Sequence, residues 1–170
     1  MKTASSPGHW EGDLIKGEGN AYALGTLVER TSRLVMLVKL PVFKPASAAN
    51  VLQAFTDKLL GIARPMLLSM TKTQGREMAM HKKLSEQTGI AVYFCDPHSP
   101  WQRGSNENMN GLVRQYLPKG TDLSIYSQEQ LDAIADEINN RPRKGLGVRS
   151  PLAVYRELLI KSPQHSTLIH

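Results

Sequence analysis

The stretch that decides the fold runs from His9 to Leu40 and reads HWEGDLIKGEGNAYALGTLVERTSRLVMLVKL. It contains three apolar or alternating runs of the kind that form β-strands: Trp10 to Ile15, Ala21 to Arg30 and Leu34 to Leu40. Short polar connections at 17–20 and 31–33 separate these runs. Because such short connections join antiparallel neighbours, the stretch predicts a three-stranded meander.

After Leu40 the pattern alternates between helices and strands. Helical spacing of apolar residues predicts a helix from Ala48 to Gly61, and the capping pair Ser127 and Gln130 opens another that ends before Pro142. The remaining predicted elements are a strand at 66–71, a helix at 75–88, a strand at 90–94, a helix at 105–117 and a last helix at 150–159. This order predicts an α/β fold of the ribonuclease-H-like type, with a mixed five-stranded sheet flanked by helices.

Length and composition favour one domain. With 170 residues the chain can bury a core of its own, and we expect a lead-in at 1–8, the folded domain at 9–159 and a tail at 160–170. No stretch approaches the roughly 18 apolar residues of a membrane span, and the N-terminus lacks the pattern of a signal peptide. We therefore expect a soluble, cytoplasmic protein without a membrane partner. The lone Cys95 excludes an internal disulfide.

The net charge is positive, at +6 from 21 basic and 15 acidic residues. Clustered Lys and Arg displace the counterions of a phosphate backbone, which makes a polyanion such as DNA a plausible partner. A solvated basic surface is the alternative interpretation. Net charge alone does not distinguish a DNA-binding surface from a solvated basic surface. Sequence motifs are needed to distinguish them.

Two stretches carry a family resemblance. They are Gly8-His9-Trp10-Glu11-Gly12-Asp13-Leu14 and the longer run Val92-Tyr93-Phe94-Cys95-Asp96-Pro97-His98-Ser99-Pro100-Trp101-Gln102-Arg103-Gly104-Ser105-Asn106-Glu107-Asn108. Supporting pieces lie at 25–30, 114–119 and 139–144. Together they resemble insertion-sequence-thirty type transposases, from residue 8 to about residue 159. These transposases belong to the retroviral-integrase-like superfamily with an Asp-Asp-Glu triad.

The resemblance implies an integrase catalytic core that cuts and joins DNA strands with the help of divalent metal. Asp13 matches the family's first Asp, on the first strand, and Glu107 matches its Glu, at the start of a helix. Both are therefore implied catalytic residues and ligands of Mg²⁺ or Mn²⁺. The alternatives are a solvated strand-end carboxylate for Asp13 and an ordinary polar helix face for Glu107.

The second Asp of the triad is replaced in this sequence. In the matching stretch Thr71-Lys72-Thr73-Gln74-Gly75, Thr73 holds the Asp position and Lys72 replaces an aromatic residue. The 33 residues between Thr73 and Glu107 are the interval expected of the triad. A neutral hydroxyl attracts Mg²⁺ far less than a carboxylate does, and Lys72 is expected to add positive charge beside it. Weak metal binding and impaired catalysis are therefore expected.

Two other carboxylates are candidate substitutes for the missing Asp, Glu77 and Asp96. Glu77 follows Thr73 by four positions, and Asp96 lies in the loop after the strand at 90–94. A surface position for Glu77 and a turn position for Asp96 are the alternatives.

DNA contacts are predicted in the loops beyond the catalytic helix. Lys119, Arg141, Arg143 and Lys144 are expected to meet phosphates of transposon ends or target DNA, with a solvated basic surface as the alternative. Family members read their terminal repeats with an N-terminal helix-turn-helix region. Because this chain begins at the edge of the catalytic core, specific end binding is expected to be absent. A homo-oligomer associated with the bacterial nucleoid is also expected.

Three functions remain open on the sequence. The first is a transposase core whose catalysis is impaired by Thr73. The second is a non-catalytic remnant that binds DNA or transposase and interferes with intact copies. The third, a ribonuclease-H-like nuclease of host function, needs the same metal site and lacks the family match.

Overall fold

The computed structural model describes residues 6–41, 48–73, 81–95 and 104–162. Its strands are β1 (His9–Lys16), β2 (Ala23–Glu29), β3 (Val35–Lys39), β4 (Ser69–Thr73) and β5 (Ala91–Cys95). Its helices are α1 (Ala48–Leu60), α2 (His81–Thr88), α3 (Gly104–Tyr116), α4 (Gln128–Asn139) and α5 (Pro151–Ile160). Among the described helices none is long and apolar enough to cross a membrane.

The strands form one mixed sheet in the order β3-β2-β1-β4-β5. β1, β2 and β3 pair antiparallel, which confirms the predicted meander, and β4 and β5 extend the sheet in parallel beside β1. The predicted five-stranded ribonuclease-H-like α/β fold is therefore confirmed. The domain limits at 9 and 159 stay a prediction, since most of the lead-in and tail lies outside the described residues.

The strand predicted at 66–71 was placed too early, because β4 begins only at Ser69. Met66 instead ends a 3-10 turn, Arg64–Met66, with Pro65 at its start. The fixed φ of proline suits the first turn of a helix, and its missing N–H cannot join a sheet. Met66 is nevertheless fully buried, so its place in an apolar run did not reveal the turn. The helix predicted at 75–88 is described from His81 onward, as α2.

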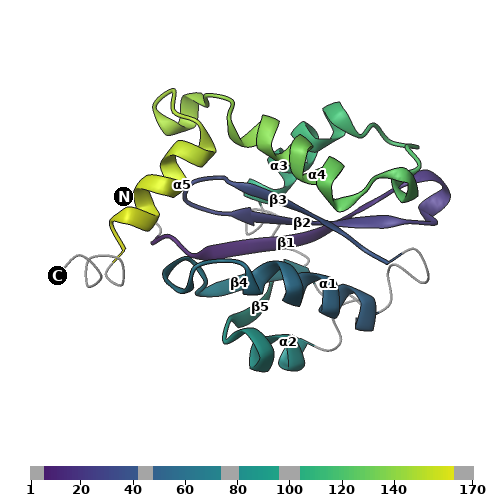
Figure 1. The fold of residues 1–170 in the computed structure, drawn as a ribbon, viewed down its shortest axis with the longest axis horizontal. Helices are drawn as coiled ribbons and strands as arrows, with labels where there is room; N and C mark the ends of the chain where they lie inside the picture. Colours follow the sequence, from purple (N-terminus) through teal and green to yellow (C-terminus); the bar gives the residue numbers. More distant parts are fainter. Residues whose placement is uncertain (1–5, 42–47, 74–80, 96–103, 163–170) are drawn as a thin grey trace.

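The sheet separates two hydrophobic clusters, which helices cover on opposite faces (Figure 1). The cluster under α1 and α2 contains Trp10, Leu27, Phe55 and Met70. The cluster under α3 and α4 contains Ile15, Leu24, Val113 and Leu131. Successive residues of each strand therefore feed alternate clusters, as the period of two requires.

Trp10 anchors the first cluster and is completely buried. Its indole Nε1–H donates to the carbonyl oxygen of Met66 at 2.7 Å, and its ring meets that of Tyr155 edge to face at 6.3 Å. A buried indole N–H without a partner would be costly, so this bond fixes where β1 lies against the turn that leads into β4.

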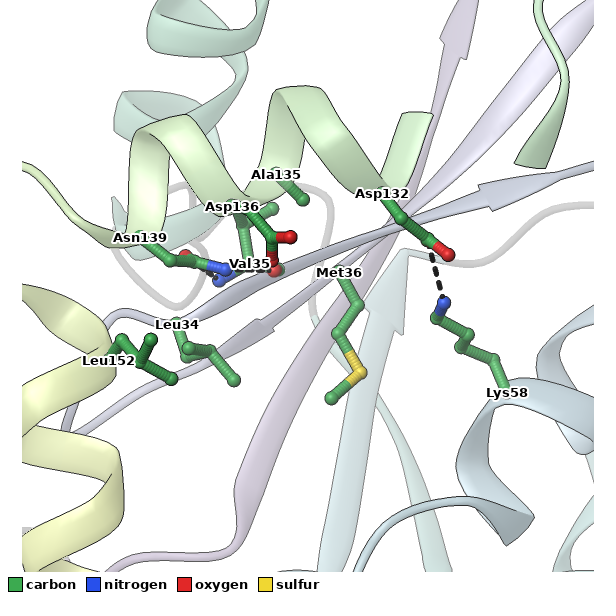
Figure 2. A pocket seen from close by; sticks show the side chains of 9 residues that line it. All are labelled: Leu34, Val35, Met36, Lys58, Asp132, Ala135, Asp136, Asn139 and Leu152. Atoms are coloured by element: carbon green, nitrogen blue, oxygen red, sulfur yellow. Dashed lines mark hydrogen bonds and ion pairs between the residues drawn. The ribbon is translucent and has the colours of Figure 1, made fainter. Parts of the chain in front are cut away.

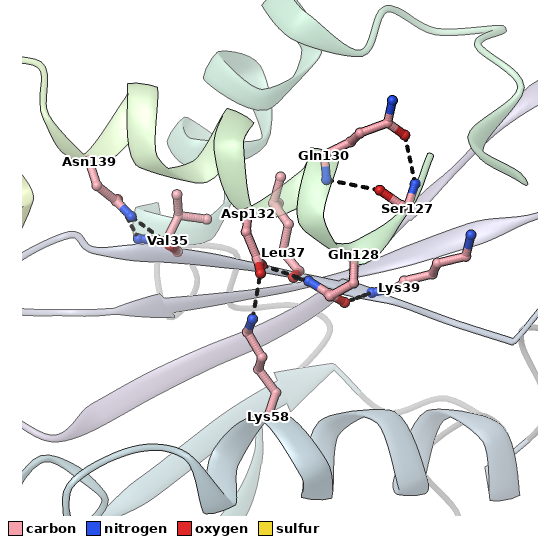
Figure 3. A network of polar contacts seen from close by, with 9 residues as sticks. All are labelled: Val35, Leu37, Lys39, Lys58, Ser127, Gln128, Gln130, Asp132 and Asn139. Atoms are coloured by element: carbon pink, nitrogen blue, oxygen red, sulfur yellow. Dashed lines mark hydrogen bonds and ion pairs between the residues drawn. The ribbon is translucent and has the colours of Figure 1, made fainter. Parts of the chain in front are cut away.

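The outer edge of β3 is covered by α4, whose amide side chains take the place of a neighbouring strand (Figure 3). Asn139 accepts from the Val35 N–H and donates to the Val35 carbonyl, both at 2.9 Å. Gln128 accepts from the Lys39 N–H at 2.8 Å and donates to the Leu37 carbonyl at 2.7 Å. Helix α4 begins at the predicted capping box of Ser127 and Gln130, which is present as expected.

A hollow of about 330 Å³ lies beside this edge, between β3, α4 and α5 (Figure 2). An ion pair between Lys58 Nζ and Asp132 Oδ1, at 3.1 Å, crosses it. None of the residues predicted from the sequence to bind metal or DNA lines this hollow. The hollow therefore lies apart from the candidate functional residues.

Replacing Asn139 by Ala is expected to lower the free energy of unfolding by about 2–4 kcal/mol, because it leaves both backbone groups of Val35 without a partner in a buried position. Asn140→Ala is the matched control. The side chain of Asn140 is exposed and only donates to the Asp136 carbonyl, so a loss below about 1 kcal/mol is expected. Urea denaturation of both variants measures the difference, and equal losses would contradict a specific role for Asn139.

Candidate active site beside the end of β4

Asp13 lies on β1, on the face of the sheet that α3 covers. Its strand neighbours alternate, because Leu14 packs against the first cluster and Ile15 belongs to the second. Both carboxylate oxygens of Asp13 accept a hydrogen bond: Oδ1 from the Leu14 N–H at 2.9 Å and Oδ2 from Asn110 Nδ2 at 3.3 Å. The carboxylate is thus held between its own strand and α3.

Asn110 links Asp13 to the helix that carries Glu107. Both residues lie on α3, three positions apart, and this spacing puts positions 107 and 110 on the same face of the helix. The side chain of Glu107 lies outside the described part of the structure. Sequence analysis missed Asn110, although its spacing from Glu107 was a signal that could have identified it.

Thr73 is the last residue of β4, and the strand register brings it next to Asp13. Gly12 pairs with Lys72 across β1 and β4, so the next residues along the two strands are Asp13 and Thr73. Its Cα is paired with that of Cys95 on the other side. The threonine side chain lies outside the described part, but its backbone position is adjacent to Asp13, as a second triad residue would be.

The expectation that Lys72 adds positive charge beside the carboxylates stays a prediction, because the structure fixes only the face of the sheet on which its side chain lies. Lys72 is only 1% exposed, and strand alternation puts it on the face of Met70, which α1 and α2 cover. Asp13 lies on the opposite face. The aliphatic part of a lysine side chain can occupy an apolar layer, which is where Lys72 takes the place of the expected aromatic residue.

Glu11 shares the strand and face of Asp13 but is held by an arginine. Its carboxylate is 1% exposed and lies 3.3 Å from Arg30 Nε. Glu29 is also buried, and it accepts hydrogen bonds from the backbone of Gly8, Thr31 and Ser32. The contacts of these two glutamates therefore hold the end of β1 and the turn after β2.

Metal ligation depends on carboxylates that the structure describes only in part. Among the described residues, no three His, Cys, Asp or Glu side chains form a group that could hold a metal ion. Glu77 and Asp96 lie outside the described residues. Asn110 lies next to Asp13, however, and its Oδ1 is enclosed without a hydrogen-bond partner in the described part of the chain. An oxygen in this state beside a carboxylate is suited to a hard cation.

The basic residues predicted to contact DNA lie in the second half of the chain, after α3 or after α4. Lys119 follows α3 and is exposed, while Arg141, Arg143 and Lys144 follow α4. Arg141 lies over the ring of Tyr116, with 5.3 Å from Cζ to the ring centroid. Burial, followed by the charges of Arg33 and Arg141, lowers the pKa of Arg143. The structure thus brings Arg33 near Arg143, a proximity that the sequence did not indicate.

No protein-family model matches the sequence. The chain is 63% identical over 153 residues to the transposase for insertion sequence element IS1086 of Cupriavidus metallidurans, a match that covers 90% of this chain and 44% of that protein. It is 49% identical to the transposase InsI for insertion sequence element IS30A of Escherichia coli, over 86% of this chain and 37% of that protein. The chain is a homologue of IS30-type transposases. It spans less than half the length of these curated relatives.

The IS30-type homologue also resembles solved integrase structures. The catalytic core domain of BIV integrase superimposes with a TM-score of 0.66 and 21% identity, over 89% of this chain and 95% of that domain. A simian T-cell lymphotropic virus intasome in complex with PP2A regulatory subunit B56 gamma gives a TM-score of 0.59 at 17% identity, over 82% of this chain and 50% of the matched chain. At such identities the likeness shows the fold, which agrees with the element order of this transposase homologue.

Removing Arg30 should destabilise the protein, because it takes away the cation that faces a buried Glu11 carboxylate. We expect Arg30→Ala to lower the free energy of unfolding by about 1–3 kcal/mol, less than for a fully buried pair because Arg30 is half-exposed. Arg156→Ala, an exposed arginine on α5, is the control, with an expected change within about 0.5 kcal/mol. Adding Glu11→Gln to Arg30→Ala should recover part of the loss. A loss no larger than that of the control would count against the pair.

Proposed function

We propose that the chain is the core of a DNA transposase that descends from enzymes of divalent-metal-dependent strand cleavage and transfer, with catalysis impaired by Thr73. The observation that carries this proposal is the juxtaposition of Asp13, position 73 and the Asn110 face of α3 at one point of the sheet. Homology to IS30-type transposases over most of the chain supports the same assignment. Because the chain covers less than half of those relatives, the activity of a whole transposase is proposed only as ancestry.

The residues present fit a divalent metal in part. Asp13 and Glu107 are the proposed carboxylate ligands, and Asn110 holds Asp13 Oδ2 in place while presenting an unpartnered oxygen of its own. When bound, Mg²⁺ or Mn²⁺ would activate the attacking oxygen and stabilise the leaving oxygen of a DNA strand. Thr73 stands where a third carboxylate would complete the charge, so this chain is expected to hold the metal weakly.

Restoring the carboxylate should restore metal affinity. We expect Thr73→Asp to bind Mn²⁺ at least about tenfold more tightly than the natural sequence, because a third negative charge joins Asp13 and Glu107. Isothermal titration calorimetry measures the affinity, and the rise in melting temperature with Mn²⁺ gives a second readout. Cleavage of transposon-end DNA should follow the same order.

The control for this variant is Thr121→Asp, which adds the same charge in the loop between α3 and α4. It should leave Mn²⁺ affinity within about twofold of the natural value, since the added charge lies in a partly exposed loop and is screened by solvent. Equal Mn²⁺ affinity and equal DNA cleavage by the natural protein and Thr73→Asp would show that Thr73 is not the lesion, and the proposal of impaired catalysis would fall.

We further propose that Lys119, Arg141, Arg143 and Lys144 bind DNA through its phosphates. All four are on loops after α3 or α4, and phosphate contacts from such residues position a protein without reading sequence. Binding should therefore weaken steeply as salt rises. Association with the nucleoid would follow from such binding.

The second candidate function is interference with intact transposase copies by a non-catalytic remnant. Thr73 favours it, because a core that keeps its fold but lacks a carboxylate can still occupy DNA or join an oligomer. Titrating the chain into a strand-transfer reaction run by an intact relative tests this function. Inhibition that rises with the chain's concentration is expected, whereas an unchanged rate at excess chain would contradict interference.

A further inference from the structure

Three arginine side chains converge on the loop between α4 and α5, and we propose that they form a binding site for the phosphates of a nucleic-acid strand. We call Arg33, Arg141 and Arg143 the arginine cluster. Arg33 comes from the turn between β2 and β3, and the other two follow α4. The inference rests on the proposed DNA binding by Arg141 and Arg143, and it adds Arg33 and the way in which the three groups are held.

The loop that carries the cluster is closed by its own backbone. Arg143 and Arg149 form an antiparallel bridge, in which the Arg143 N–H donates to the Arg149 carbonyl at 3.0 Å. The guanidinium of Arg33 lies directly on the backbone of Gly145, where an added Cβ would be only 2.9 Å from Arg33 Cζ. Any larger residue at 145 would displace Arg33, so the glycine makes room for the third arginine.

The positive charge of the cluster has no acidic partner within the described residues. Glu157, on α5, is paired with Arg149 and Lys161 instead. The cations of Arg33 and Arg141 lower the pKa of Arg143, after burial, which lowers it most. Arg143 Nη2 is enclosed and has no hydrogen-bond partner among the described residues. The repulsion among the three guanidinium groups and the unpaired N–H donor of Arg143 are both unfavourable. An anion would offset the charge and accept a hydrogen bond from that donor.

Phosphate is the anion that fits this arrangement. A guanidinium presents planar, paired N–H donors that match phosphate oxygens, and three of them can surround one or two phosphate groups. Arg141 is held in place by the face of Tyr116, at 5.3 Å from the ring centroid. Arg141 and Arg33 are therefore packed against other groups of the protein without a ligand.

The position of the cluster on the fold favours a nucleic-acid strand over a free anion. Tyr116 lies on α3 six residues after Asn110, which contacts Asp13. At 1.5 Å per residue this is roughly 9 Å along the helix axis, or the length of about three nucleotides of a duplex strand. A strand whose scissile phosphate lies at Asp13 would reach the cluster within a few nucleotides.

Backbone strain is concentrated in the same region. Arg33 and Val148 both have φ of 63°, a left-handed conformation that non-glycine residues, and β-branched ones above all, adopt rarely. Val148 is also 71% exposed, so burial of its side chain does not explain the conformation. Strained residues of this kind tend to persist where a binding surface requires them.

The test is DNA binding in EDTA, measured by fluorescence anisotropy with a short duplex of unrelated sequence. Arg33→Ala, Arg141→Ala and Arg143→Ala should each weaken binding about tenfold and reduce the slope of log affinity against log salt by about 1. Arg156→Ala removes an equally charged, exposed side chain from α5 and should change binding less than about twofold. EDTA separates this readout from metal binding and catalysis.

A second variant and a second measurement distinguish loss of a phosphate contact from loss of the folded structure. Gly145→Ala keeps every charge but displaces the Arg33 guanidinium, and it should weaken DNA binding several-fold. Without DNA, Arg33→Ala should melt at the same temperature as the natural protein or higher, because it relieves repulsion. With DNA, the natural protein should gain more in melting temperature than the variant.

Several outcomes would overturn the proposal. If the cluster variants bind DNA like the natural protein while Lys119→Ala weakens binding, the cluster is not a phosphate site, although the proposed DNA binding stands. If the natural protein binds no DNA at all, both proposals fail. If inorganic phosphate stabilises the protein through the cluster but DNA does not bind, a free phosphate is the ligand and the nucleic-acid assignment is wrong.

Discussion

The hydrogen bond from the Trp10 indole to the Met66 carbonyl is the contact on which the candidate site depends. It ties β1 to the turn before β4 and so sets the register in which Gly12 faces Lys72. A slip of one residue would move Asp13 to the opposite face of the sheet, away from α3. The apolar cluster around Trp10 thus positions a polar site on the opposite face of the sheet. A change in that cluster would therefore also change the site.

The order of elements and two of the proposed triad positions could be predicted from the sequence. Hydrophobic periods and caps are local, and Asp13 and Glu107 lie within recognisable motifs. What the sequence did not reveal depends on contacts between distant segments. The burial of Lys72 on the far face, the contact of Asn110 with Asp13 and the approach of Arg33 to Gly145 require strand register and loop closure. The turn at Met66 failed for a different reason, since buried apolar residues look alike in strands and turns.

Charge is distributed unevenly along the second half of the chain. Helix α4 carries Glu129, Asp132, Asp136 and Glu137 and no basic residue, and the sign changes as soon as the helix ends, at Arg141. A polyanion that approaches this side would be repelled by the helix and attracted by the loop that follows it. The net charge of +6 does not describe this separation of acidic and basic residues. The separation would orient an approaching polyanion as well as attract it.

The amide side chains of Asn139 and Gln128 occupy hydrogen-bonding groups that the outermost strand, β3, would otherwise offer to its surroundings. Open sheet edges recruit strands from other molecules, which is a common start of aggregation. With this edge occupied from within, two copies of the chain cannot fuse their sheets across β3 without first detaching α4. Self-association on this side of the molecule would have to be built from side chains, and it would remain reversible.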